Sequence, residues 1–200
     1  MKYKLYAFDF DLTLADTLAV SEKTYMAAFS AIGKTFDGDV FHHLARDLKA
    51  SFAETDDGKN DYGVFLSTFE QTAESLFHEV ALYPDVLDYV KKLKSSGVST
   101  ALITNRNRRS VDKALLKYLP AEELFDHIIT GDVTENFKPH PEPILKCLSV
   151  SGVEKKDFVY IGDAENDMLS ATRAGVDFIY VDRYGKLNKP NSVKTLFEID

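Results

Sequence analysis

Cysteine is almost absent from this sequence of 200 residues, which contains Cys147 alone. A single cysteine excludes an intrachain disulfide and a cysteine-rich zinc site, and we expect Cys147 to pack in a helix without a chemical role. Long apolar runs are missing too, and the apolar stretch near the N-terminus is interrupted by Asp9 and Asp11, so it cannot serve as a signal-peptide core. These features predict a soluble, cytoplasmic protein without a membrane partner.

An excess of positive charge is also lacking, because the formal net charge is -8. This balance argues against a protein whose main role is to hold nucleic acid or an anionic membrane. An acidic surface does not attract phosphorylated substrates, so binding them requires a local cluster of cations. Hydrophobic residues at 44% and charged residues at 28% are ordinary for a globular chain, and the length suffices for one domain with a substantial insertion.

Short β-rich apolar segments alternate with helical patterns through most of the chain. The expected strands cover residues 3–9, 98–103, 127–130, 158–162 and 177–181. The expected helices cover residues 84–96, 109–119, 141–151 and 165–174. Such alternation predicts an α/β fold with right-handed βαβ units and a doubly wound parallel sheet.

Residues 17–80 interrupt this alternation. They contain no convincing strand. Their patterns predict helices near 17–31, 40–50 and 61–79, with a polar turn at 54–61. An insertion after the first strand of a parallel sheet follows that strand's carboxyl end, where such folds bind their ligands. We therefore expect a Rossmann-like catalytic core from residues 1–16 and 81–200, and a helical cap from residues 17–80.

Pairs of carboxylates follow two of the expected strands. Asp9 and Asp11 lie in FDFDLT at the end of the first strand, and Asp163 and Asp167 lie in GDAENDM after strand 158–162. Like charges so close are expensive to bury without a cation, and Mg²⁺ prefers oxygen ligands such as carboxylates. An aspartate turn and a helix N-cap are the plain structural alternatives. Because neighbouring parallel strands would bring Asp9 and Asp163 together, we favour a shared metal site.

Two further segments offer groups that bind anions. ITNR at 103–106 ends a strand with a hydroxyl, an amide and the free N–H groups of the next helix. KPHPEP at 138–143 places Lys138 in a proline-stiffened segment, where an ammonium can neutralise carboxylates and hold a phosphate oxygen. Each segment alone is weak evidence, because Thr and Asn are common in such turns and most lysines are solvated.

The order and strand context of these four segments resemble the haloacid dehalogenase-like hydrolase superfamily, whose signature is an aspartate pair, a Ser/Thr, a Lys and a final acidic pair. The resemblance covers nearly the whole chain. It implies that Asp9 is the nucleophile that attacks phosphorus. It also implies that Asp11 is the general acid and base, and that Thr13 supports their loop.

The same resemblance implies which residues bind the phosphate and the metal. Thr104 and Asn105 would hold the phosphoryl oxygens, and Lys138 would bind both the phosphate and the nucleophile. Magnesium would be held by Asp9, Asp11 through its backbone carbonyl, Asp163 and Asp167, the last either as a direct ligand or behind one.

Asp11 and the helical insertion narrow the resemblance further. Carbon–halogen dehalogenases lack an aspartate at the place of Asp11 and need no magnesium, so the chain resembles the phosphatases, whose alkoxide leaving group requires a proton. The insertion resembles the first-type cap of phosphoglycolate phosphatase-like and phosphosugar-mutase-like members. One departure is Leu12, where many members have glycine, and a φ above zero would strain leucine there.

Several basic residues are candidates for contacts with the substrate. The segment FHHLARDLK offers His42, His43, Arg46 and Lys49, although a solvated helix face is the more ordinary interpretation. NRNRR at 105–109 could attract an anionic substrate, with some of its arginines projecting into solvent.

The resemblance implies a magnesium-dependent phosphatase that hydrolyses a small phosphorylated metabolite through an aspartyl phosphate on Asp9, as a monomer or homodimer. A phosphosugar mutase shares all four motifs and is the first alternative. A non-catalytic phospho-binding module is the second, and it is disfavoured because Asp9, Asp11, Lys138 and Asp163 are all present.

Overall fold

The computed structural model describes residues 1–44, 48–55, 58, 61–186 and 189–199. The chain divides into two compact units, one of Met1–Asp16 with Ala81–Asp200 and the other of Thr17–Val80. Two short strands, β2 (Ala15–Asp16) and β3 (Ala81–Leu82), pair antiparallel where the chain leaves and re-enters the first unit. They have two residues each, which is too short for an alternating pattern, and the sequence did not predict them.

A parallel sheet with the strand order β5-β4-β1-β6-β7 forms the centre of the first unit. Its strands are β1 (Leu5–Phe8), β4 (Ser99–Ile103), β5 (His127–Ile129), β6 (Phe158–Gly162) and β7 (Asp177–Tyr180). Every strand lies within two residues of its predicted bounds, and neighbouring strands pair in parallel. The predicted doubly wound α/β fold is therefore confirmed.

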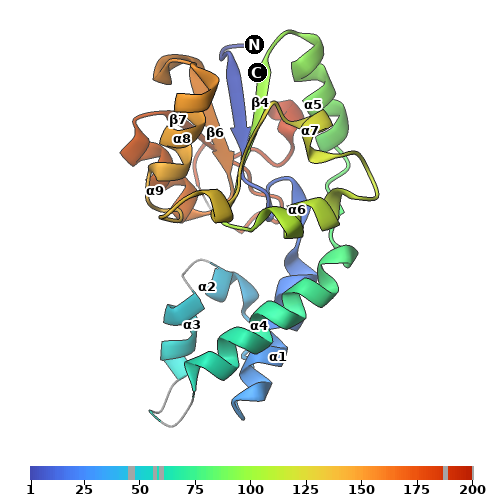
Figure 1. Ribbon diagram of the computed structural model, residues 1–200, viewed down its shortest axis with the longest axis vertical. Helices are drawn as coiled ribbons and strands as arrows, with labels where there is room; N and C mark the ends of the chain where they lie inside the picture. Colours follow the sequence, from blue (N-terminus) through green and yellow to red (C-terminus); the bar gives the residue numbers. More distant parts are fainter. Residues whose placement is uncertain (45–47, 56–57, 59–60, 187–188, 200) are drawn as a thin grey trace. The chain divides into compact units, whose positions relative to one another are not determined.

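Helices cover both faces of this sheet, as Figure 1 shows for α8 and α9 on one side and α5 and α7 on the other. The helices are α5 (Val86–Ser95), α6 (Arg108–Leu115), α7 (Ala121–Leu124), α8 (Glu142–Ser151) and α9 (Glu165–Ala174). Short 3₁₀ helices add η2 (Gly131–Val133), η3 (Lys155–Asp157) and η4 (Leu196–Glu198). This two-sided cover explains why every residue of β1 and β6 is buried.

Cys147 lies in α8, in the apolar cluster that joins α8 and α9 to the sheet. Its side chain is fully buried, and burial raises the pKa of the thiol to about 12. A buried, protonated thiol is a packing group. The expected packing role of Cys147 is confirmed.

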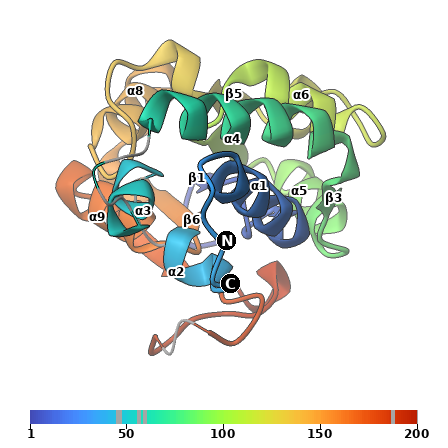
Figure 2. The same ribbon diagram turned by 90° about the horizontal axis from the view of Figure 1, so that it is seen from below.

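The second unit is helical, as predicted. It contains α1 (Leu18–Ala31), α2 (Val40–Leu44), α3 (Leu48–Thr55), α4 (Tyr62–Leu76) and η1 (Phe77–Glu79). Helices α1 and α4 run side by side (Figure 2) around an aromatic core that includes Phe29 and Phe65, whose ring centroids lie 5.1 Å apart. The second helix of this unit was predicted to end near residue 50. This end is wrong, because α3 continues to Thr55 with Phe52 packed into this core. In the described parts of the chain, no helix is both long and apolar enough to cross a membrane.

Candidate active site

The candidate site begins where three neighbouring strands end. Strands β4, β1 and β6 lie next to one another, and Thr104, Asp9 and Asp163 follow their last residues. The backbone N–H of Asp9 donates to the carbonyl of Ile161 at 2.8 Å, so the sheet's hydrogen bonding extends to the first carboxylate. Parallel strands thus bring together residues that lie more than 150 positions apart in the sequence.

The Lys138 ammonium is the cation at the centre of this site. Its Nζ lies 2.5 Å from Oδ1 of Asp9 and 2.6 Å from Oδ1 of Asp167, and the Lys138 side chain is 5% exposed. It also donates to the hydroxyl of Tyr160 at 2.8 Å and approaches the carbonyl of Ile103 at 3.4 Å. The ammonium therefore links the ends of β1, β4, β6 and α9.

Asn105 fixes the backbone of Lys138. Its Oδ1 accepts from the Lys138 N–H at 2.9 Å, and its Nδ2 donates to the Lys138 carbonyl at 3.2 Å. The peptide bond between Lys138 and Pro139 is cis. Asn105, predicted as a phosphate-binding residue, thus also positions the lysine.

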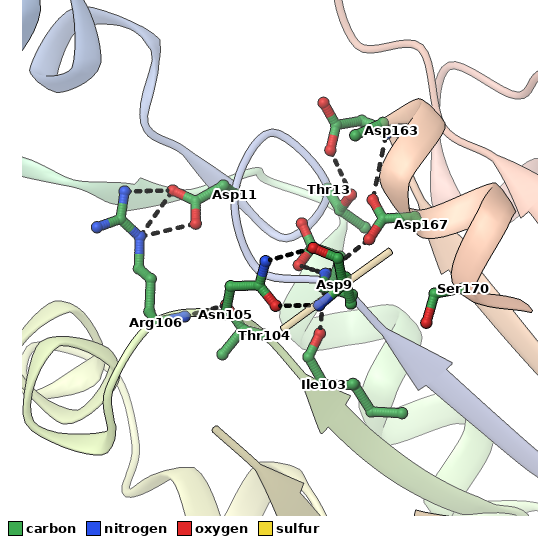
Figure 3. A network of polar contacts seen from close by, with 12 residues as sticks. Asp9, Asp11, Thr13, Ile103, Thr104, Asn105, Arg106, Asp163, Asp167 and Ser170 are labelled. Atoms are coloured by element: carbon green, nitrogen blue, oxygen red, sulfur yellow. Dashed lines mark hydrogen bonds and ion pairs between the residues drawn. The ribbon is translucent and has the colours of Figure 1, made fainter. Parts of the chain in front are cut away.

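Three carboxylates gather beside the ammonium (Figure 3). Asp9, Asp163 and Asp167 each offer an oxygen, and these oxygens lie within 4.8 Å of one another. Thr13 donates to Oδ1 of Asp163 at 3.5 Å, and the Ala164 N–H donates to Oδ2 of Asp167 at 3.2 Å. The site therefore brings together the side chains of three of the four residues predicted to bind the metal; the fourth, Asp11, was predicted to bind through its backbone carbonyl.

Glycine is required at the end of β6 by the approach of Asp167. A Cβ atom on Gly162 would lie 2.5 Å from Oδ2 of Asp167, which is closer than real Cβ contacts. The absence of a side chain at this position therefore lets the first turn of α9 bring its carboxylate to the sheet edge.

Burial and like charges dominate the electrostatics of the site. Burial, together with the nearby carboxylate of Asp167, raises the pKa of Asp9 to about 7 against the opposing charge of Lys138. Burial, Asp167 and Asp9 together raise the pKa of Asp163 well above its usual value. Burial alone would lower the pKa of Lys138, but the charges of Asp167 and Asp9 outweigh it and raise that pKa. One ammonium thus leaves negative charge in the group uncompensated.

Asp11 lies apart from this group and pairs with Arg106. Nε and Nη2 of Arg106 donate to both carboxylate oxygens at 2.7 to 2.9 Å. Figure 3 shows the Asp11 carboxylate turned toward Arg106 and away from Asp9. Asp11 could therefore join the predicted metal site only through its backbone carbonyl. Arg106 was predicted only as one of the arginines at 105–109 that could attract an anionic substrate; its contact with Asp11 was not predicted, although its place directly after Asn105 is a signal of a role in the site.

The loop after β1 explains the departure at Leu12. Leu12 has a φ of 53°, in the left-handed region, so the strain expected for leucine there is present. The N–H groups of Leu14 and Ala15 both donate to the carbonyl of Phe10, at 3.0 and 2.9 Å, which holds the loop tight. Leu12 is 5% exposed, so apolar burial offsets its backbone conformation.

Two residues of the site region were missed by the sequence analysis. Tyr160 was treated as a plain strand residue, although a hydroxyl in an otherwise apolar strand, three residues before Asp163, is a detectable signal. Arg183 donates to the carbonyl of Thr13 at 2.8 and 3.1 Å and to Oδ2 of Asp85 at 2.8 Å, which fixes the loop after β1. It lies in a polar stretch for which no pattern predicted a structure.

The basic residues of the helical unit that were predicted as possible substrate contacts differ in their exposure. His43 is buried, with its ring centroid 5.2 Å from that of Tyr25, so the solvated-face interpretation is wrong for this residue. Its position results from aromatic packing in the core of the helical unit. His42 lies 2.8 Å from the carboxylate of Glu54, and Lys49 is exposed. Arg46 lies outside the described residues.

The arginines that follow Asn105 also differ in their contacts and exposure. Arg108 pairs with Asp112 and Glu122 on the surface, and Arg109 is exposed. Arg106 is the member of this run whose guanidinium contacts a predicted catalytic residue.

Comparisons with known proteins define the class. Residues 6–181 match the family model described as haloacid dehalogenase-like hydrolase. Phosphoglycolate phosphatase 1 of Pseudomonas aeruginosa is 33% identical over 183 residues, which cover 86% of this chain and 67% of the relative. The pyrophosphatase PpaX of Bacillus cereus is 28% identical over 178 residues, which cover 88% and 81%. A haloacid dehalogenase-like hydrolase structure from Bacteroides fragilis matches with a TM-score of 0.89 and 25% identity, covering 100% of both chains.

The chain therefore belongs to the haloacid dehalogenase-like hydrolases and is an enzyme of that family. The resemblance inferred from the four motifs is confirmed. The curated relatives reported above are named as a phosphatase and a pyrophosphatase.

Proposed function

We propose that this enzyme is a magnesium-dependent phosphatase that hydrolyses a small phosphorylated metabolite through an aspartyl phosphate on Asp9. The observation that carries the proposal is the buried group in which Asp9 contacts the Lys138 ammonium at 2.5 Å beside Asp163 and Asp167. A carboxylate held against a cation, among further carboxylates at the carboxyl ends of parallel strands, is suited to attack on a phosphoryl group.

The donor set supports a magnesium ion. Three carboxylates lie close enough together to bind one metal ion. The raised pKa values of Asp9 and Asp163 show that burial and mutual repulsion disfavour their negative charges, which a cation would stabilise. Hard oxygen ligands of this kind favour Mg²⁺ over softer metals. Asp9, Asp163 and the Asp11 carbonyl would hold the ion, which would neutralise charge on the phosphoryl oxygens.

Asp167 is better suited to holding the lysine than to binding the metal. Its Oδ1 accepts from Nζ of Lys138, and its Oδ2 accepts from the Ala164 N–H. Both oxygens are thus occupied by donors. We infer that Asp167 positions Lys138 and lies behind the direct ligands.

The first half-reaction uses Asp9 and Asp11. A carboxylate oxygen of Asp9 attacks phosphorus, the bond from phosphorus to the ester oxygen breaks, and Asp11 gives its proton to the departing alkoxide. Lys138 and the hydroxyl of Thr104, at the end of β4, hold the phosphoryl oxygens. The ammonium offsets the charge that accumulates on these oxygens.

The second half-reaction returns the enzyme to its starting state. Asp11, now a carboxylate, takes a proton from water, and the resulting hydroxide attacks phosphorus. The bond to Asp9 breaks, inorganic phosphate leaves, and the Asp9 carboxylate and protonated Asp11 are regenerated.

The two units have different roles in this proposal. Met1–Asp16 and Ala81–Asp200 form the catalytic core, and Thr17–Val80 is a cap that excludes water and selects the substrate. The cap resembles those of the family's phosphoglycolate phosphatase-like members.

Phosphate release from a panel of phosphate esters tests the proposal. The panel includes phosphoglycolate, pyrophosphate, phosphosugars, nucleotides and an aryl phosphate, each with magnesium, with EDTA and with the Asp9→Asn variant. We expect turnover that requires magnesium and is abolished by Asp9→Asn. Activity that survives in Asp9→Asn, or conversion of a phosphosugar to its isomer without free phosphate, would contradict the proposal.

A further inference from the structure

The pairing of Asp11 with Arg106 conflicts with the work that Asp11 has to do. Two guanidinium nitrogens hold both carboxylate oxygens of Asp11 at 2.7 to 2.9 Å. A general acid must instead reach the ester oxygen of a phosphate held beside Asp9. Asp11 therefore has to leave Arg106 before the first half-reaction.

The backbone of Arg106 is held by two hydrogen bonds. The Arg106 N–H donates to the Thr104 hydroxyl at 3.2 Å, and the Arg106 carbonyl accepts from the Gly131 N–H at 2.7 Å. A Cβ on Gly131 would lie 2.3 Å from the carbonyl of Asn105, so this loop and its neighbour are in close contact. Arg106 thus projects from a fixed place two residues after Thr104, a proposed phosphate-binding residue.

Other cations in this region are already engaged. Arg108 pairs with Asp112 and Glu122, and Lys138 is buried between Asp9 and Asp167. The Arg106 and Asp11 side chains are 25% and 27% exposed, so a small solute can reach their contact. A planar guanidinium binds a carboxylate or a phosphate with the same two-pronged geometry that it uses for Asp11.

We propose that Arg106 couples recognition of a second anionic group on the substrate to the release of Asp11. A carboxylate or second phosphate on the substrate replaces the Asp11 carboxylate on the guanidinium, and the freed Asp11 takes up a proton from solvent and gives it to the ester oxygen. A substrate with no second anion must break the ion pair without a replacement. The enzyme accordingly prefers phosphate compounds that carry a second negative group, an inference that rests on the proposed function.

A matched pair of substrates isolates this effect. Phosphoglycolate and ethyl phosphate differ mainly in a carboxylate that replaces a methyl group, and their ratio of kcat/KM reports the recognition of that carboxylate. We expect a ratio of about tenfold or more in the wild type, equivalent to one bidentate ionic contact. Pyrophosphate, compared with methyl phosphate, shows whether a second phosphate serves as well as a carboxylate.

Variants of Arg106 connect the ratio to this residue. Arg106→Gln should bring the ratio close to one, and Arg106→Lys, which keeps the charge but loses the fork, should leave an intermediate ratio. Arg109→Gln removes the same charge from an exposed position three residues away and should keep the wild-type ratio. If Arg106→Gln lowers kcat/KM equally for both esters, the residue only positions Asp11 and the proposal is overturned.

Binding measurements separate this inference from the proposed function. Calorimetry on Asp9→Asn, with and without Arg106→Gln, gives the ratio of Kd for phosphoglycolate and ethyl phosphate without any turnover. If the wild type releases no phosphate from any ester, the proposed function fails, and the binding ratio still tests Arg106. Loss of selective binding in the double variant supports the proposal, whereas an unchanged ratio contradicts it.

Discussion

The Nζ atom of Lys138 lies 2.5 Å from Oδ1 of Asp9, and the two side chains are only 5% and 8% exposed. The same ammonium lies 2.6 Å from Asp167, so one buried cation serves two buried carboxylates. Removal of one member of such a group leaves the other charges without compensation in a medium that solvates them poorly. Lys138 is thus part of the stability of the fold as well as of the proposed chemistry.

Replacement of Lys138 should therefore destabilise the enzyme and abolish phosphate release. For Lys138→Met we expect a loss of about 3–5 kcal/mol in the free energy of unfolding at neutral pH, because Asp9 and Asp167 stay buried without their cation. Urea unfolding in EDTA measures this loss. Lys91→Met, at an exposed position on α5, is the control and should change stability by about 0.5 kcal/mol or less. Equal stability of Lys138→Met and wild type would refute the expectation.

The raised pKa of Asp9 predicts a pH dependence with a definite sign. Its folded-state pKa of about 7 lies above the ordinary value of 3.8, so the folded state binds this proton more tightly than the unfolded state. In EDTA, the contribution of Asp9 to stability is therefore greatest at low pH and declines as the pH rises from about 4 to about 7. Asp9→Asn lacks this titration.

The difference between the two proteins is the quantity to measure. Urea unfolding at several pH values should show the variant gaining stability relative to wild type between about pH 4 and pH 7, with little change above that. A difference that is constant or falls across this window would show that burial does not raise the Asp9 pKa.

Tyr160→Phe tests the hydroxyl that the Lys138 ammonium contacts. This hydroxyl accepts from Nζ at 2.8 Å and lies 3.0 Å from the carbonyl of Ile103. Its removal should cost about 1–2 kcal/mol of stability and lower kcat by about tenfold, because the ammonium loses an acceptor and is held less firmly. Tyr180→Phe, on the adjacent strand β7, removes a surface contact with Glu165 of α9 and should leave kcat unchanged. A normal kcat in Tyr160→Phe would assign that hydroxyl to stability alone.

The sequence predicted the sheet and the separate parts of the site because both rest on local signals. Apolar runs set the strands, and each polar motif directly follows one of them, as Asp9 follows β1 and Asp163 follows β6. The family resemblance then assigned their roles. Such motifs predict which strand each side chain follows. Parallel pairing of these strands then brings the side chains together at one edge of the sheet.

What the sequence did not predict depends on side-chain direction. The turn of Asp11 toward Arg106 joins two residues 95 positions apart, and no periodicity encodes it. His43 follows the same principle, because its burial depends on aromatic rings contributed by other segments, such as Tyr25 and Phe36. Contacts of this kind appear only when the elements are packed together.

Variants of Leu12 test whether its backbone strain or the burial of its side chain has the larger effect on stability. Glycine would relieve a left-handed conformation that costs leucine about 1 kcal/mol, but it would lose a buried side chain contributing about 1.5–3 kcal/mol. Leu12→Gly should therefore be less stable than wild type by about 1 kcal/mol. Leu12→Ala loses most of the burial and keeps the strain, so it should be the least stable of the three. Thermal unfolding gives the order, and greater stability of Leu12→Gly than wild type would mean that strain outweighs burial.

Chemical trapping of the phosphorylated residue tests directly whether Asp9 is the nucleophile. The enzyme is quenched during turnover, reduced with borohydride, which converts an aspartyl phosphate to homoserine, and digested for mass spectrometry. We expect homoserine at position 9, with magnesium and substrate both required, and none in Asp9→Asn. Modification at another residue, or rapid turnover with no modification at position 9, would contradict the assignment of Asp9 as the nucleophile.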